Sequence, residues 1–195
     1  MKNIGLYFGS FNPVHVGHLV LANHIIAHSL VDEIWFVISP QNPLKDPQEL
    51  APEKDRLRML NTAISGVEHM VACDVEFELD RPSYTSNTLR YLRSKHPDLH
   101  FTIVLGEDIK KNFHLWKDFE WILEEFPMFL YPRHNSEAFE SPINWSHYRV
   151  SIISAPRIEI SSTAIRADIK KGVDIRFLLP EAVIKYIREH HLYQS

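Results

Sequence analysis

Two histidines lie three residues apart in a segment that joins a strand-like run to a run with helical spacing. They are His15 and His18, and residues 9–18 read GSFNPVHVGH. At this spacing both imidazoles can lie on one face of the first helical turn. Free backbone N–H groups and the helix dipole favour an anion there. The segment therefore predicts a phosphate-binding site, in which Gly9 permits close approach of the ligand and Ser10 offers a hydroxyl donor.

Other interpretations of the histidine pair stay open at this point. A single histidine at a helix start is more often a cap or a surface residue than a ligand-binding group. A zinc site needs a third protein ligand, and none stands nearby in the sequence. The chain has neither a GxxxxGK[ST] phosphate loop nor a GxGxxG dinucleotide fingerprint, so a bound phosphate would be held in another way.

A second anion-binding pattern stands near the C-terminus, where residues 160–166 read ISSTAIR. Ser161, Ser162 and Thr163 are good helix caps, and Arg166 follows about one turn later. Such a helix start can bind an anion. The alternative is an ordinary N-cap followed by a solvated arginine, with Ser162 and Thr163 acting as caps only.

Taken together, the two segments resemble the HxGH and ISSTxIR signatures of the nucleotidylyltransferase superfamily. The resemblance implies that His15, His18 and Arg166 are catalytic and contact the phosphates of ATP. It further implies an ATP site made of Gly9, Ser10, Phe11, His15, His18, Gly106, Asp108, Arg133, Ser161 and Arg166.

Three further segments resemble one branch, the bacterial nicotinate mononucleotide adenylyltransferases. Residues 83–89 read SYTSNTL, residues 106–108 read GED, and Trp116 follows. These correspond to SYTxDTL, GxD and a downstream tryptophan, and the resemblance runs from about Ile4 to His190. It implies an acceptor site made of Lys45, Tyr84, Thr85, Asp108 and Trp116.

The acceptor residues suit a pyridine mononucleotide. Trp116 can stack on a flat pyridine ring, a contact worth about 1–3 kcal/mol by analogy with base stacking. Thr85 and backbone amides beside Trp116 can donate to a carboxylate, which accepts hydrogen bonds but cannot donate them. Asp108 can orient a ribose hydroxyl or help to hold magnesium. Trp116 and Tyr84 also suit core packing, and a loop lysine such as Lys45 is usually solvated.

The chain departs from the family pattern at three positions. Asn12 and Asn87 stand where many relatives have aspartate, and Glu107 stands where a small residue is common. The two asparagines remove negative charge with little change of shape. They place in question any carboxylate role there, but not the phosphate-binding scheme.

The resemblance implies that the chain transfers the adenylyl group of ATP, with Mg2+, to nicotinate mononucleotide in NAD biosynthesis. Nicotinate adenine dinucleotide and pyrophosphate would be the products. Nicotinamide mononucleotide or another phosphorylated acceptor is the alternative, and a catalytically silent nucleotide-binding protein is a third possibility.

Composition bounds the class of protein. The chain has 195 residues, 45% of them hydrophobic and 24% charged, a net charge of -4 and one cysteine. The charge argues against general nucleic-acid binding, and no apolar run is long enough for a membrane span. We expect one cytoplasmic domain over residues 1–195, while the oligomeric state does not follow from the sequence.

Alternating patterns predict a Rossmann-like, doubly wound α/β fold with a mostly parallel sheet and helices on both faces. The expected strands are 4–8, 33–39, 70–77, 100–105, 128–131 and 150–153. The expected helices are 16–29, 52–65, 84–94 and 117–125, followed by a C-terminal helical part from about 162 (162–171 and 180–190). Residues 40–52 and 137–146 are expected to be loops.

Overall fold

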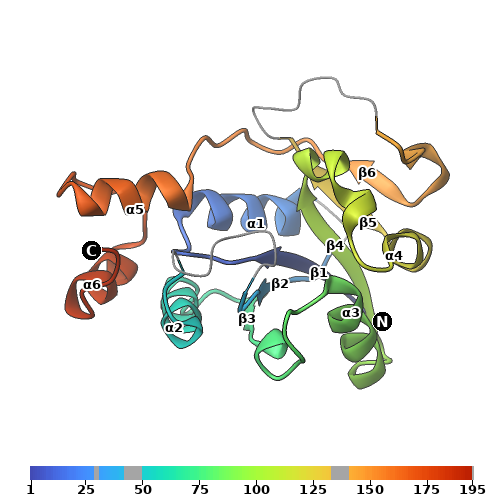
Figure 1. The fold of residues 1–195 in the computed structure, drawn as a ribbon, viewed down its shortest axis with the longest axis horizontal. Coiled ribbons are helices and arrows are strands. Elements are labelled where there is room, and N and C mark those ends of the chain that lie inside the picture. Colours follow the sequence, from blue (N-terminus) through green and yellow to red (C-terminus); the bar gives the residue numbers. More distant parts are fainter. Residues whose placement is uncertain (29–30, 42–49, 133–140, 195) are drawn as a thin grey trace.

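A six-stranded sheet forms the centre of the computed structural model, which describes residues 1–28, 31–41, 50–132 and 141–194. The spatial order is β3-β2-β1-β4-β5-β6, and every neighbouring pair is parallel (Figure 1). The predicted Rossmann-like α/β class is therefore confirmed. The strands are β1 (Lys2–Gly9), β2 (Glu33–Ile38), β3 (Met70–Cys73), β4 (Leu99–Gly106), β5 (Met128–Tyr131) and β6 (Val150–Ile152).

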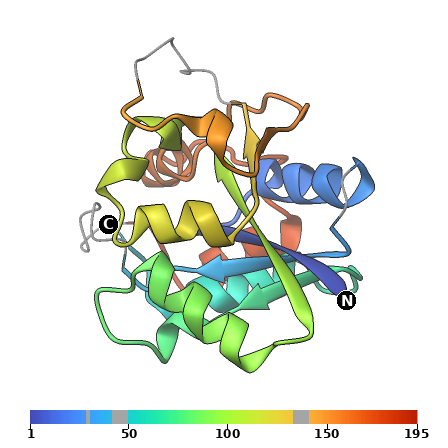
Figure 2. The same cartoon turned by 90° about the vertical axis from the view of Figure 1, so that its right-hand side faces the viewer.

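Helices cover both faces of this sheet, because successive strand residues point to opposite sides. On β1, Tyr7 packs into one hydrophobic cluster, while Ile4 and Leu6 pack into the other. The first cluster receives residues from α1 (Val16–His28), α2 (Glu53–Ala63), α5 (Ser162–Lys170) and α6 (Glu181–Glu189). The second receives residues from α3 (Thr85–Lys95) and α4 (Phe119–Glu125), which face the viewer in Figure 2.

The order of the strands reverses between β1 and β4. The chain moves outward from β1 through β2 to β3, and then returns to place β4 on the other side of β1. The loops that follow β1 and β4 turn away from each other, which opens a crevice beyond the carboxyl ends of these strands. After β6 the chain runs back across the molecule to α5, at the end opposite β6 in Figure 1. No helix among the described residues is long and apolar enough to cross a membrane.

Three of the expected elements differ from the structure. The predicted strand 70–77 ends at Cys73, and Val75–Phe77 forms a 3-10 turn that directs the Glu76 side chain inward. The predicted helix 117–125 begins at Phe119, since Asp118 has a left-handed backbone with φ of 55°. Part of the predicted loop 137–146 carries a 3-10 turn, Trp145–His147, while residues 137–140 lie outside the described ranges.

A buried arginine joins the loops that leave the sheet. Arg56 on α2 is 1% exposed and donates to four backbone carbonyls. They belong to Ser10 (2.8 Å), Ser39 (2.7 Å), Pro40 (2.9 Å) and Ala51 (2.9 Å). Burial lowers the pKa of Arg56, but a guanidinium keeps its charge in proteins. Its donors therefore satisfy carbonyls that the strand ladders no longer reach.

A buried carboxylate holds the start of α3. Glu76 is 2% exposed and accepts hydrogen bonds from the hydroxyls of Ser83 and Thr88, both at 2.8 Å. Burial raises the pKa of Glu76, although these hydroxyl donors oppose the rise. The turn that leads into α3 is thereby attached to the 3-10 turn after β3.

We expect Arg56→Met to lower the free energy of unfolding by about 4 kcal/mol, because four buried or partly buried carbonyls lose a charged donor. Urea denaturation followed by circular dichroism measures this loss. Arg58→Met, at an exposed position on the same helix, is the matched control and should change stability by less than about 0.5 kcal/mol. Equal losses in the two variants would show that the carbonyls do not depend on Arg56.

The raised pKa of Glu76 predicts a pH-dependent stability difference from Glu76→Gln. Above its ordinary pKa of 4.5 the folded chain still holds the Glu76 proton that the unfolded chain releases. The free energy of unfolding therefore falls as pH rises towards the folded-state pKa. Urea titrations measure the free energy of unfolding of both proteins between about pH 4 and about pH 8. The free energy of unfolding of the wild type, relative to that of Glu76→Gln, should be lowest at the upper end of this range. A difference that does not vary with pH, or that varies in the opposite sense, would contradict this account.

Candidate active site

A cleft of about 1280 Å³ lies at the carboxyl ends of β1 and β4. Its lining comes from the loop after β1, the start of α3, the segment after β4 and the start of α5. Twelve of the residues singled out from the sequence line it: Gly9, Ser10, Phe11, His15, His18, Tyr84, Thr85, Gly106, Asp108, Trp116, Ser161 and Arg166. The other two, Lys45 and Arg133, lie outside the described residues.

The histidine pair is built into the first turn of α1. The backbone N–H groups of His18 and Leu19 donate to the His15 carbonyl, at 3.0 and 3.4 Å, so His15 stands where the helix begins. The two imidazole rings stack with centroids 3.6 Å apart and an interplanar angle of 22°. Both rings therefore lie on one side of the helix start, as the spacing predicts.

A backbone hydrogen bond sets the tautomer of His18. The N–H of His15 donates to Nδ1 of His18 at 3.2 Å. A neutral imidazole carries hydrogen on only one ring nitrogen, so Nδ1 as acceptor leaves the hydrogen on Nε2. His18 can therefore present an Nε2–H donor to an oxygen anion in the cleft.

Glycines leave room for the rings beside them. A Cβ on Gly9 would lie 2.9 Å from the ring of Phe11, and a Cβ on Gly17 would lie 3.0 Å from Nδ1 of His15. Phe11 has a φ of 43° and packs edge-on against His18, with ring centroids 5.1 Å apart. The small residues of the motif thus fix where its aromatic and imidazole rings stand.

The second motif meets the first through direct hydrogen bonds. Ser161 is the N-cap of α5, and its hydroxyl accepts from the N–H of Ala164 at 3.1 Å. Ser162 donates to the Pro13 carbonyl at 2.9 Å, so its hydroxyl is not merely a cap, as the sequence left open. Arg166 donates to the Asn12 carbonyl at 3.0 Å. This bond holds its guanidinium beside the segment 9–18 that carries His15 and His18, called the histidine loop below.

The predicted acceptor residues come from two different walls of the cleft. Tyr84 and Thr85 stand at the start of α3, and Trp116 follows the 3-10 turn Phe113–Leu115 after β4. The Trp116 ring packs on the buried Phe113, with centroids 4.9 Å apart and an angle of 33°. Trp116 therefore both packs on a core residue and lines the cleft.

Several lining residues were missed by sequence reasoning. Lys117 also lines the cleft, and its Nζ lies 4.9 Å from the ring centroid of Tyr84. Glu76 and Arg157 line it too. Lys117 and Arg157 carry no local pattern that separates them from surface charges. The proximity of Glu76 to the SYT segment depends on the 3-10 turn that interrupts the expected strand.

The three departures from the family pattern have different surroundings. Asn12 is 2% exposed and lines the cleft, where its side-chain oxygen accepts two hydrogen bonds. Glu107 forms an ion pair with Lys110 at 3.0 Å, which offsets its charge near the predicted phosphate site. Asn87 lies in the first turn of α3.

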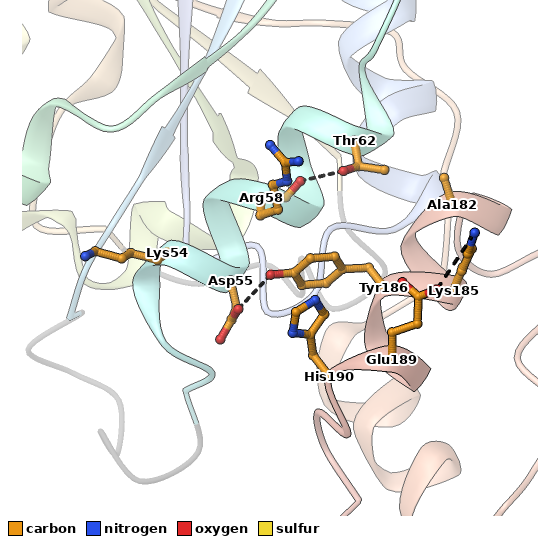
Figure 3. A pocket seen from close by; sticks show the side chains of 9 residues that line it. All are labelled: Lys54, Asp55, Arg58, Thr62, Ala182, Lys185, Tyr186, Glu189 and His190. Atoms are coloured by element: carbon orange, nitrogen blue, oxygen red, sulfur yellow. Dashed lines mark hydrogen bonds and ion pairs between the residues drawn. The ribbon is translucent and has the colours of Figure 1, made fainter.

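A second, smaller groove of about 670 Å³ lies between α2 and α6, and none of the predicted site residues that the structure describes lines it. Figure 3 shows Tyr186 at its centre, hydrogen-bonded to Asp55 at 2.7 Å. The ring of His190 stacks on Tyr186, with centroids 4.1 Å apart. The Tyr186–Asp55 hydrogen bond attaches α6 to α2, while the stack with His190 lies within α6 and its C-terminal cap.

Similarity to other proteins extends over nearly all of the chain. A family model of cytidylyltransferase-like proteins matches residues 6–168. A "Probable nicotinate-nucleotide adenylyltransferase" from Flavobacterium psychrophilum is 42% identical over 192 residues, 98% of this chain and 99% of that protein. A protein of the same name from Bacteroides thetaiotaomicron is 40% identical over 186 residues, 95% of this chain and 91% of that protein.

A solved structure shares the fold. It is the Plasmodium falciparum nicotinic acid mononucleotide adenylyltransferase complexed with NaAD, with a TM-score of 0.80 and 23% identity. The match covers 99% of this chain and 98% of that chain. The resemblance predicted from the motifs is confirmed by the sequence relatives, and this chain belongs to the nicotinate-nucleotide adenylyltransferase family of cytidylyltransferase-like proteins.

Proposed function

We propose that this chain transfers the adenylyl group of ATP to the phosphate of nicotinate mononucleotide, releasing pyrophosphate and nicotinate adenine dinucleotide. This reaction belongs to NAD biosynthesis, and we expect it to take place in the cytoplasm. One observation supports the proposal most directly. The histidine loop, the start of α5 and the residues suited to a pyridine nucleotide line the same cleft. Relatives at 40–42% identity that bear the name of this activity support it independently.

The reaction needs no protein nucleophile. An oxygen of the acceptor phosphate is already anionic near neutral pH, and it attacks the α-phosphorus of ATP in line with the leaving group. The bond from the α-phosphorus to the bridging oxygen breaks, and pyrophosphate departs with the electron pair. Catalysis then consists of positioning the reactants and stabilising negative charge.

We assign this stabilisation to His18 and Arg166. The Nε2–H of His18 donates to a phosphate oxygen, because its Nδ1 is already held by the backbone of His15. The guanidinium of Arg166 is held at the loop by the Asn12 carbonyl and supplies positive charge beside the histidines. These preorganised donors need little rearrangement as charge develops on the polyphosphate.

ATP is expected to enter as its magnesium complex, in which the ion offsets charge on the pyrophosphate. The described residues contain no group of three or more His, Cys, Asp or Glu side chains arranged to hold a metal ion. Mg2+ usually keeps several waters and binds mainly through substrate phosphates with one or two carboxylates. Asp108, which lines the cleft, is the carboxylate we propose for that role or for a ribose hydroxyl.

The part of the cleft lined by Thr85 and Trp116, called the acceptor wall, is suited to the carboxylate of a nicotinate ring. The ring of Trp116, already oriented by Phe113, offers a stacking surface to the pyridine. The Thr85 hydroxyl and backbone amides near Trp116 donate to the carboxylate. A neutral carboxamide there would bring donors of its own, which makes it a poorer partner.

Pyrophosphate release tests the function directly. With ATP and magnesium, we expect release with nicotinate mononucleotide and a kcat/KM at least about 10-fold lower with nicotinamide mononucleotide, because the donors favour a carboxylate. Equal use of both acceptors would retain the adenylyl transfer and contradict the carboxylate recognition. ATP binding without release from either acceptor would indicate another phosphorylated acceptor or a silent nucleotide-binding protein.

His18→Ala should lower kcat by about 100-fold or more, with a smaller change in KM for ATP, because its donor acts on charge that develops in the transition state. Steady-state kinetics with saturating acceptor measures both constants. His24→Ala, at a histidine on α1 that does not line the cleft, is the control and should retain the wild-type kcat. A variant that only raised KM would contradict the assignment.

A further inference from the structure

The C-terminal segment reaches the loop that carries the histidines. Tyr193, two residues before the C-terminal Ser195, donates from its hydroxyl to Oδ1 of Asn12 at 2.8 Å. The same oxygen accepts the backbone N–H of Ala51 at 3.0 Å. The Asn12 carbonyl accepts Arg166 at 3.0 Å. Three distant parts of the chain thus hold a single residue that lies just ahead of the HxGH histidines.

We propose that Tyr193 is a positioning residue for adenylyl transfer, whose hydroxyl fixes Asn12 and thereby the loop that carries His15 and His18. The inference rests on the proposed function, since it assigns the loop to ATP. It concerns a residue that lies outside both signature motifs and acts only through Asn12.

The backbone of the segment supports a specific role. His191 and Tyr193 have φ values of 52° and 64°, in the left-handed region that non-glycine residues seldom adopt. Such a conformation persists where surrounding contacts require it. Here the N–H of Leu192 donates to the Ile187 carbonyl at 3.0 Å, and both Leu192 and Tyr193 pack against the first hydrophobic cluster. These contacts turn the chain back from α6 towards Asn12.

The surroundings keep the phenol protonated. Burial raises the pKa of Tyr193, although the nearby positive charges of Arg56 and Arg166 act in the opposite direction. A protonated hydroxyl has the hydrogen that Asn12 Oδ1 needs, so the contact persists at neutral pH.

The path from Tyr193 to the reacting groups is short. Asn12 is followed by Pro13, whose carbonyl accepts from Ser162, and then by Val14 and His15. The N–H of His15 in turn holds Nδ1 of His18. A shift at Asn12 therefore changes the placement of both imidazoles and of the carbonyl that holds Arg166. Misplacement of catalytic groups by about 1 Å can cost as much as about 100-fold in rate.

Tyr193→Phe tests the proposal, because it removes the hydroxyl and keeps the ring. We expect kcat to fall about 10-fold, with less than about 3-fold change in KM for ATP. Tyr186→Phe is the matched control, since it removes a similar phenol hydrogen bond, to Asp55, in the groove of Figure 3 and away from the cleft. It should lower the melting temperature about as much as Tyr193→Phe while leaving kcat unchanged.

A double-mutant cycle identifies the route. If Tyr193 acts through Asn12, then Tyr193→Phe should lower kcat no further in an Asn12→Ala background. Wild-type kcat in Tyr193→Phe would overturn the proposal, as would equal kinetic losses in Tyr186→Phe or independent losses in the cycle. The wild-type enzyme is assayed first with ATP and nicotinate mononucleotide. If it shows no turnover, the proposed function fails; if it shows turnover, the variants test the role of Tyr193 separately.

Discussion

Residues just beyond the ends of the parallel strands have backbone carbonyls that need hydrogen-bond donors from outside the sheet. This constraint governs the site. Arg56 meets it with one side chain, because its planar fork of donors reaches carbonyls after β1, after β2 and before α2. The carbonyl of Ser10 is one of them, so the first residue beyond β1 is fixed by a buried charge. The fixed position of Ser10 sets where the rest of the histidine loop begins.

Two helix starts then converge on the loop. The start of α1 presents His15 and His18, and α5 presents Ser161 at its N-cap and Arg166 about one turn later. Hydrogen bonds from α5 to the carbonyls of Asn12 and Pro13 hold the two helix starts next to each other. Tyr193 adds a hydrogen bond to Asn12 from the C-terminal segment. The donors that we propose for phosphate binding are thus held by the backbone of one short loop, which suits a reaction that depends on positioning.

The residues proposed to bind the acceptor are supported by contacts other than those that hold the proposed phosphate site. Glu76 holds the turn before α3 through Ser83 and Thr88, and Phe113 orients Trp116 after β4. Ser39 links the two sets of contacts, because its side chain hydrogen-bonds to Glu76 and its N–H donates to the Gly9 carbonyl at 3.0 Å. Kinetics with different acceptors can distinguish the contributions of acceptor preference and adenylyl transfer.

The sequence alone determined the parallel α/β class, most element positions and the residues of both signatures, because periodicity and short motifs are local properties. It missed Arg56, Glu76 and Tyr193 as supports of the site. Arg56 resembles any charged residue on a helix, and Glu76 stands in an apparent strand that the structure ends at Cys73. Tyr193 lies 181 residues from its partner Asn12. Only the tertiary structure decided these roles, since a buried hydrogen bond between distant segments leaves no pattern in the sequence around either partner.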